Sequence, residues 1–115
     1  MLESNTLDYL LKKRLYDALN RAKLKNMYCD IDIEFMRDLW NKQKGKCALT
    51  GIPMTIDKHG RTNTNVSIDR IDSNKGYTKD NVQLVCSAIN FMKSNLVLSE
   101  FEYYCKAVVD YKKNN

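Results

Sequence analysis

Residues 67–93, SIDRIDSNKGYTKDNVQLVCSAINFMK, limit the possible folds of this chain more than any other part of the sequence. Apolar and polar residues alternate over residues 66–71, as they do in a half-buried strand. A second short apolar run follows at residues 82–85, and the loop between the two runs turns at Gly76. A helix is expected directly afterwards, over about residues 86–94. The stretch therefore predicts an antiparallel hairpin followed by a helix.

Two further helices are expected before this unit. The first is expected to be capped by Asn5 or Thr6 and to run to about residue 25, because apolar residues recur at the spacing of one buried helical face. That stripe consists of Leu7, Leu11, Leu15, Leu19 and Ala22, and the opposite face is rich in lysine and arginine. A solvated face and a phosphate-binding face are both compatible with this charge. The second helix covers about residues 33–43, with Asp32 as its N-cap.

A last helix is expected at about residues 98–112. Ser99 and Glu102 have the spacing of a capping box, which typically marks a helix start. Phe101, Cys105, Val108 and Val109 supply a face on which this helix can pack. Together with the hairpin, these helices predict a small α+β fold in a single domain of residues 1–115.

Composition favours a negatively charged partner. Nineteen basic and fourteen acidic residues give a net charge of +5, which assists binding to a polyanion through counterion release. No apolar run approaches the roughly 20 residues that a membrane span requires, and the N-terminal residues lack the pattern of a signal peptide. We therefore expect a cytoplasmic protein without a membrane partner, with its four cysteines reduced.

The order of polar residues in the hairpin and helix suits a site for one metal ion. Asp69 lies at the end of the first strand, and Asn90 lies inside the following helix, so the two side chains could meet across the unit. Hard ions such as Mg²⁺ take oxygen ligands and keep several waters, so one carboxylate and one amide oxygen can suffice. Such an ion stabilises the charge that develops when a phosphodiester is hydrolysed.

With these residues in order, the sequence resembles the HNH endonuclease family, whose ββα-metal core has this arrangement. It is most similar to small phage and prophage members, with a DRID motif in place of DHxD. The resemblance covers about residues 40–105, with the ββα unit at about residues 65–94, and the basic N-terminal helix in residues 1–28 lies outside it. It implies a metal-dependent DNA endonuclease or nickase, phage-encoded, that uses one Mg²⁺ or Mn²⁺ ion.

The resemblance also assigns roles to individual residues. Asp69 matches the family's metal carboxylate and Asn90 its second metal ligand. Asn81 matches the Asn that holds the loop between the strands, and Lys93 is placed to contact the scissile or an adjacent phosphate. Each residue has a structural alternative, since Asn81 could serve only as a turn or cap residue, and Asn90 and Lys93 could lie on an exposed helix face. Asp69 could form an ion pair with a nearby arginine, Arg70 or Arg61.

Arg70 occupies the position at which the family carries its catalytic His. Arginine stays protonated at any ordinary pH, so it cannot take a proton from water as His does. Arg70 could hold the phosphate while Asp72, His59 or a water acidified by the metal supplies the base. Alternatively, the site binds DNA without cutting it, or Arg70 only neutralises Asp69 and Asp72. The catalytic set implied by the resemblance is Asp69, Arg70, Asn81 and Asn90.

Further basic residues surround these positions and could contact the DNA backbone. They are Arg61, Lys75 and Lys79, beside Arg70 and Lys93. No helix has the spaced side chains of a base-reading element, so we expect DNA to be bound through its backbone and shape. Phage packaging or other phage proteins are possible additional partners. The alternative functions are a catalytically weak or inactive DNA-binding protein on the same scaffold, and a protein-binding module that docks through its first helix.

Many HNH proteins brace this core with a zinc ion held by two Cys-x-x-Cys pairs. Here Cys47 and Cys86 each lack the second thiol, because Thr50 and Ile89 stand three residues later. A structural zinc site requires four closed ligands. No structural zinc is therefore expected.

Overall fold

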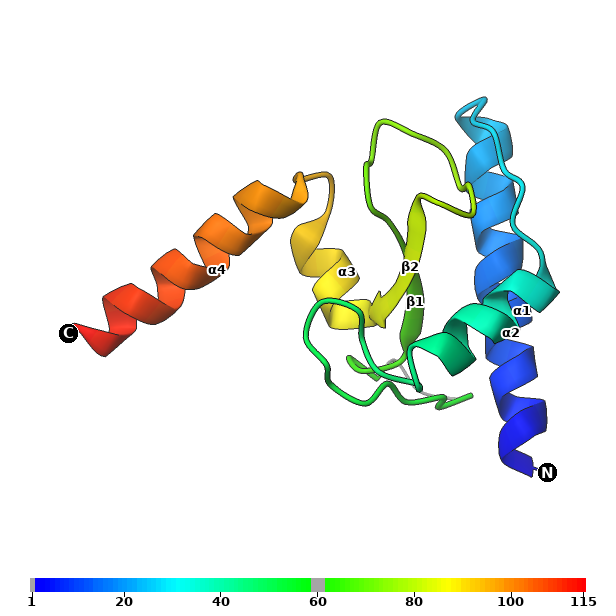
Figure 1. The fold of residues 1–115 in the computed structure, drawn as a ribbon, viewed down its shortest axis with the longest axis horizontal. Coiled ribbons are helices and arrows are strands. Elements are labelled where there is room, and N and C mark those ends of the chain that lie inside the picture. The colour runs from blue at the N-terminus through cyan, green and yellow to red at the C-terminus, as the bar shows by residue number, and fades with distance from the viewer. Residues whose placement is uncertain (1, 59–61) are drawn as a thin grey trace.

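The computed structural model describes residues 2–58 and 62–115, except for the side chains of residues 2–5. The described residues form four helices and one two-stranded antiparallel sheet (Figure 1). The elements are α1 (Leu2–Leu24), α2 (Ile33–Lys42), β1 (Val66–Arg70), β2 (Val82–Cys86), α3 (Ser87–Lys93) and α4 (Leu98–Lys113). The predicted α+β class and the predicted order of hairpin and helix are both confirmed.

The hairpin has a register that is symmetric about Gly76. Val66 pairs with Cys86, and Asp69 pairs with Gln83. Helix α3 begins at the residue after β2, so its first turn continues directly from the strand. Because cross-strand partners lie on the same face of a sheet, the side chains of Asp69 and Gln83 are direct neighbours.

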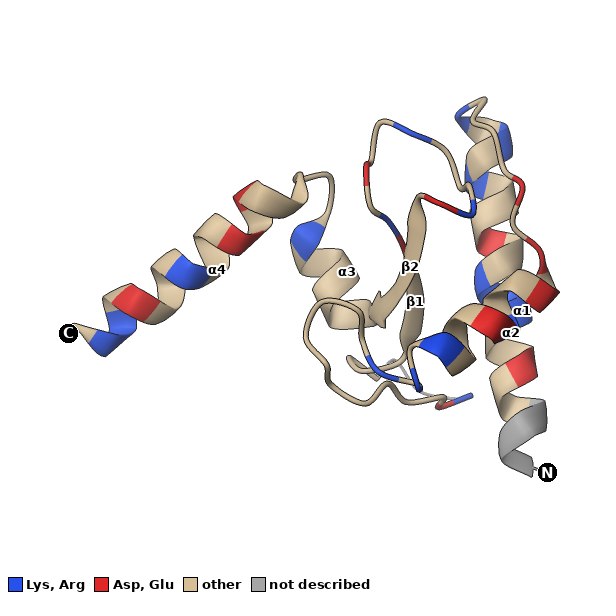
Figure 2. Ribbon diagram, viewed as in Figure 1, with Lys and Arg blue, Asp and Glu red and all other residues tan. Residues whose placement is uncertain are grey.

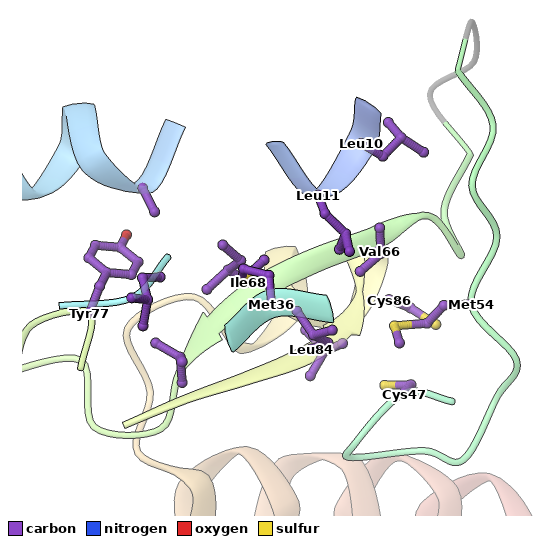
Figure 3. Packing of buried hydrophobic residues seen from close by; sticks show 14 of the residues in the cluster. Leu10, Leu11, Met36, Cys47, Met54, Val66, Ile68, Tyr77, Leu84 and Cys86 are labelled. Carbon is purple, nitrogen blue, oxygen red and sulfur yellow. The ribbon is translucent and has the colours of Figure 1, made fainter. Parts of the chain in front are cut away.

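The hydrophobic core lies between α1, α2 and the hairpin (Figure 3). Leu11 of α1, Met36 of α2 and Leu84 of β2 are completely buried in it. The predicted stripe of α1 is only partly correct, because Leu19 is 43% exposed while Leu10 and Ala18 are buried in the core. The buried face of α1 is therefore rotated relative to the predicted one, since this helix packs against both α2 and β1.

N-caps were predicted for three helices, and the structure confirms one of them. Asp32 caps α2, because its carboxylate accepts a hydrogen bond from the amide of Phe35 at 2.8 Å. Helix α1 begins at Leu2, before the predicted start at Asn5 or Thr6. Helix α4 begins at Leu98 with Val97 as its N-cap and no side-chain cap bond. The predicted capping box is wrong because Ser99 already lies inside the first turn, where it cannot act as the cap.

The loop between β1 and β2 is fastened to the segment that follows α1. The amide of Tyr77 donates to the carbonyl of Tyr28 at 2.9 Å, and the amide of Asp30 donates to the carbonyl of Tyr77 at 3.1 Å. The contact is so close that a Cβ atom on Gly76 would lie 2.2 Å from the carbonyl oxygen of Tyr28. Only glycine therefore fits at this position without a shift of the backbone.

Helix α4 extends away from the rest of the molecule (Figure 1). All of its residues are described, and Phe101 is the only buried one. Val108 and Val109, which the sequence assigned to a packing face, are exposed, and Cys105 is half-buried. The predicted face exists on the helix, but most of it contacts nothing in the chain, because α4 projects beyond the core.

Charges differ between the two ends of the molecule (Figure 2). Helix α1 carries basic residues along its second half, including Arg21 and Lys23, whereas α4 begins with Glu100 and Glu102 and ends with lysines.

Within the described ranges, no helix has both the length and the apolar character that crossing a membrane would require.

Candidate active site

A cleft of about 520 Å³ opens where α1, β1 and α3 meet. Its polar wall contains Asp69 and Arg70 from β1 and Asn90 from α3. Arg21 of α1, Lys25 just after that helix and Phe91 of α3 also line it. Three of the four residues predicted to be catalytic therefore line a single cleft.

Asp69 lines this cleft but is almost fully buried, with only 3% of its surface exposed. One carboxylate oxygen accepts a hydrogen bond from Gln83 Nε2 at 2.9 Å. The other lies 3.2 Å from Lys93 Nζ, which also donates to the carbonyl of Arg70 at 3.3 Å. The cation paired with Asp69 is thus Lys93 and not Arg70. The other predicted alternative, Arg61, lies outside the described residues.

Lys93 has the largest side chain among those that are fully buried, with 1% of its surface exposed. A buried ammonium group is tolerated only when it is paired and hydrogen-bonded, and Asp69 provides that pairing. The sequence placed Lys93 against a phosphate. In this structure its ammonium group points inward to the carboxylate, and Lys93 is absent from the cleft wall.

Asn90 is oriented by hydrogen bonds to β1. Its Nδ2 donates to Ser67 Oγ at 2.8 Å and to the carbonyl of Ile68 at 3.0 Å. Because a backbone carbonyl can only accept, the amide nitrogen must face the strand, and this directs Oδ1 the other way. Asn90 is half-buried and lines the cleft, so this oxygen can serve as a ligand.

The two side chains suit a hard cation. Each oxygen of Asp69 has one hydrogen-bonding partner and retains capacity for another ligand, and Asn90 Oδ1 supplies a neutral oxygen. Magnesium and manganese sites accept such a set when water completes the coordination. The described part of the chain contains no cluster of three or more His, Cys, Asp and Glu side chains that could hold a metal, so a metal here would rely on Asp69, Asn90 and solvent.

Arg70 is held against the loop between the strands. Its Nη1 donates to the carbonyls of Ser73 at 2.8 Å and Lys75 at 3.1 Å, and it lies 3.0 Å from the sulfur of Met27. The guanidinium group also lies over the Tyr77 ring, 5.2 Å from its centre. No ion pair joins Arg70 to an acidic residue within the described ranges.

Asn81 fixes the same loop and is itself buried. Its Oδ1 accepts from the amide of Asp72 at 2.9 Å, and its Nδ2 donates to the carbonyls of Asp72 at 3.0 Å and Gly76 at 2.8 Å. The carboxylate of Asp72 accepts from the amide of Asn74 at 2.9 Å. Asp72 therefore caps the loop and is not part of the cleft wall.

The remaining predicted residues lie elsewhere. Lys75 and Lys79 are exposed on the loop but do not line the cleft. The backbone amide of Lys79 donates to Asp30 at 3.0 Å, which adds to the attachment of the loop. His59 and Arg61 are outside the described residues.

Two residues that the sequence did not single out are part of the site. Gln83 hydrogen-bonds to Asp69, and a hairpin register symmetric about Gly76 would have revealed it. Phe91 is 86% exposed and forms part of both this cleft and a neighbouring one of about 510 Å³, where Lys13 and Arg14 lie. Its position next to Asn90 was the only signal in the sequence that pointed to it.

The two cysteines of the incomplete zinc pattern lie close together in the core (Figure 3). Burial, followed by the neighbouring Cys47 thiol, raises the pKa of Cys86 to about 11. Burial also acts to raise the pKa of Cys47, but hydrogen bonds with the Thr50 side chain and with backbone groups outweigh it and lower this pKa. Both cysteines are buried, and Thr50 supplies a hydrogen bond where a second thiol would stand.

Comparison with known proteins identifies a structural relative. No protein-family model matches the sequence, and no curated protein sequence matches it either. Among solved structures, the rare-cutting HNH restriction endonuclease PacI, described for its mechanism of DNA perturbation, is similar with a TM-score of 0.64. The match covers 88% of this chain and 78% of the PacI chain at 19% sequence identity. The chain therefore has the fold of an HNH endonuclease.

Proposed function

We propose that this protein is a metal-dependent DNA endonuclease or nickase of the HNH type. The observation that carries the proposal is the meeting of a buried carboxylate and an oriented amide oxygen, Asp69 and Asn90, in one cleft with basic walls. The shared fold with an HNH restriction endonuclease supports it. A phage origin, with phage packaging or other phage proteins as further partners, belongs to this proposal and rests on the sequence resemblance alone.

Asp69 and Asn90 are the residues proposed to hold the divalent ion, Mg²⁺ or Mn²⁺. When bound, the ion supplies a positive charge that stabilises the phosphoryl group during cleavage. Gln83 and Lys93 fix the orientation of the Asp69 carboxylate from behind, and Ser67 and Ile68 fix that of Asn90. This arrangement keeps both oxygens in position before substrate binds.

Arg70 is proposed to bind phosphate and not to act as a base. Its side chain lines the cleft while Nη1 is anchored on the loop carbonyls, and the planar guanidinium group suits a phosphate oxygen. Asn81 acts as a positioning residue, because it holds the loop on which those carbonyls lie. Of the side chains considered as bases, Asp72 is committed to capping the loop.

The DNA backbone is proposed to lie along the basic wall of the cleft. Arg21 and Lys25 are exposed there, opposite the side formed by α3. Contacts by Lys93, Lys75, Lys79 and Arg61 remain predictions from the sequence. The exposed ring of Phe91 stands between the two clefts, where an aromatic side chain can stack on a base or insert between base pairs.

A second candidate function is DNA binding without efficient cleavage on the same scaffold. The observations that favour it are the replacement of a histidine-type base by Arg70 and the pairing of Asp69 with Lys93. In that case the buried ion pair stabilises the fold, and the basic walls remain the functional part. Binding would then depend on salt, because it comes from phosphate contacts.

A supercoiled-plasmid assay with Mg²⁺, Mn²⁺ or EDTA separates the two functions. Under the first proposal, wild type cuts or nicks DNA only with metal, and the isosteric Asp69→Asn variant loses activity at a temperature where circular dichroism shows that it is still folded. Asp38→Ala is the matched control, since Asp38 is an acid on α2 outside the cleft. Cleavage by Asp69→Asn at the wild-type rate would refute the first proposal.

The Arg70→His variant distinguishes the remaining cases if wild type does not cut. Cleavage by that variant alone, together with salt-sensitive DNA binding by wild type, would establish the second function. If wild type neither cuts nor binds DNA in low salt, as measured by fluorescence anisotropy, both functions are excluded.

A further inference from the structure

Helix α4 exposes more apolar surface than a solvated helix requires. Tyr104 is 54% exposed, Val108 64% and Tyr111 70%. Over the described residues, α4 makes no extensive contact with any other helix or strand. Contiguous apolar surface of this kind is uncommon on monomers and marks an interaction site.

Tyr104, Val108 and Tyr111 form one stripe with Phe101, whereas the exposed Tyr103 and Val109 lie outside it. Phe101, Tyr104, Val108 and Tyr111 are separated by three, four and three residues, which is the spacing of a helix that packs against another helix. Phe101 at the start of the stripe is buried next to the domain, and the remainder projects beyond it. The free stripe is therefore suited to a helical partner lying alongside α4.

The charges on α4 indicate the nature of that partner. Glu100 and Glu102 lie in its first turns and Lys112 and Lys113 in its last turn, as Figure 2 shows. Lys106 and Asp110 pair with each other within the helix. A second α4 that crosses antiparallel near Val108 brings the acidic end of each helix next to the basic end of the other. A parallel pair would instead bring like charges together.

We propose that α4 binds α4 of a second copy of this chain in an antiparallel, two-fold symmetric dimer. In such an interface the same residues face each other from both copies, so one stripe with opposite charges at its ends is self-complementary. Two tyrosines, one valine and the stems of the flanking charged residues bury roughly 600 Å² per copy. That area lies at the lower end of specific interfaces, where many complexes are weak or transient.

Sedimentation equilibrium of the full chain tests the dimer over a range of protein concentrations. Wild type is expected to dimerise at micromolar concentration. Val108→Asp, which buries an unpaired carboxylate in the interface, should raise the dissociation constant by about 100-fold or more. Leu24→Asp is the matched control, because Leu24 is 86% exposed on α1 and should leave association unchanged. A wild type that stays monomeric overturns the proposal, and so does a dimer that Val108→Asp does not weaken.

A charge exchange tests the antiparallel orientation separately. The Glu100→Lys/Glu102→Lys and Lys112→Glu/Lys113→Glu variants should each self-associate more weakly than wild type. An equimolar mixture of the two should associate more strongly than either variant alone, because in a mixed antiparallel pair the lysines at each end of one variant meet the glutamates at the facing end of the other. The mixed dimer should therefore form about as well as the wild-type dimer, and a variant carrying all four changes, which restores opposite charges at both ends, should also associate like wild type. A four-fold variant that stays as weak as the double variants would overturn the proposed orientation.

Discussion

The ββα unit buries polar side chains, whereas α4 exposes apolar ones. Asp69, Asn81 and Lys93 are all at most 5% exposed, and no buried side-chain nitrogen or oxygen in the described residues lacks a hydrogen-bonding partner. On α4, Tyr104 and Val108 are more than half exposed. The difference shows whether a side chain contacts its partner within the chain or needs a partner from outside it. The polar residues of the core find theirs within the chain, and the apolar residues of α4 require one from outside.

The largest effect should come from breaking the buried ion pair. Lys93→Met leaves the Asp69 carboxylate buried without its cation, which should lower the free energy of unfolding by about 4 kcal/mol. The Asp69→Leu/Lys93→Met double variant should recover much of this loss, since an apolar pair needs no charge compensation. Urea denaturation measures both. Equal stability of Lys93→Met and wild type would mean that the pair contributes nothing to the fold.

Loss of the loop anchor should have the next largest effect. Asn81→Ala removes three hydrogen bonds and leaves the amide of Asp72 and the carbonyl of Gly76 without these partners, at a cost of about 2 kcal/mol. The comparison is with Asn74→Ala, a residue of the same loop whose side chain should change stability by less than about 0.5 kcal/mol. Urea denaturation measures both variants, and equal unfolding midpoints for the two would contradict the anchoring role of Asn81.

Phe91 sharpens the comparison because it belongs to the ββα unit but is exposed like the residues of α4. Phe91→Ala should leave the unfolding free energy nearly unchanged and weaken DNA binding by about 1.5 kcal/mol, or roughly tenfold. Fluorescence anisotropy with a labelled duplex measures the affinity. Unchanged affinity would show that the ring does not contact the DNA.

The smallest effect is expected on α4. In dilute solution Tyr104→Ser should change stability by no more than about 0.5 kcal/mol, because the side chain lacks extensive packing within its own chain. At high protein concentration the same substitution should lower the melting temperature relative to wild type, since association stabilises the folded state by mass action. A large loss of stability in dilute protein would mean that α4 packs on its own domain.

The ββα unit was predictable from the sequence because its signals are local. The alternation in residues 66–71, Gly76 at the turn and the run after it determine the strands, their register and the start of α3. The α+β class follows from the same pattern. Asn81 as a loop anchor was also within reach, since an Asn near a turn commonly bonds to the backbone.

Contacts between distant segments could not be predicted in this way. The pairing of Lys93 with Asp69 depends on the angle between β2 and α3. The hydrophobic periodicity of the sequence does not predict that angle. The rotation of the buried face of α1 arises because two elements share it. A packing face on α4 was predicted from Phe101, Cys105, Val108 and Val109, but a sequence pattern does not say whether the partner of such a face lies in the same chain.

The contact between Gly76 and the carbonyl of Tyr28 joins the stretch resembling HNH proteins to the segment that precedes it. That stretch begins near Trp40, yet the loop that holds Arg70 and Asn81 is hydrogen-bonded to residues that precede it. Met27 also contacts Arg70 directly. A shortened protein that begins at Trp40 would retain every predicted site residue and still lose the surface on which the loop is shaped.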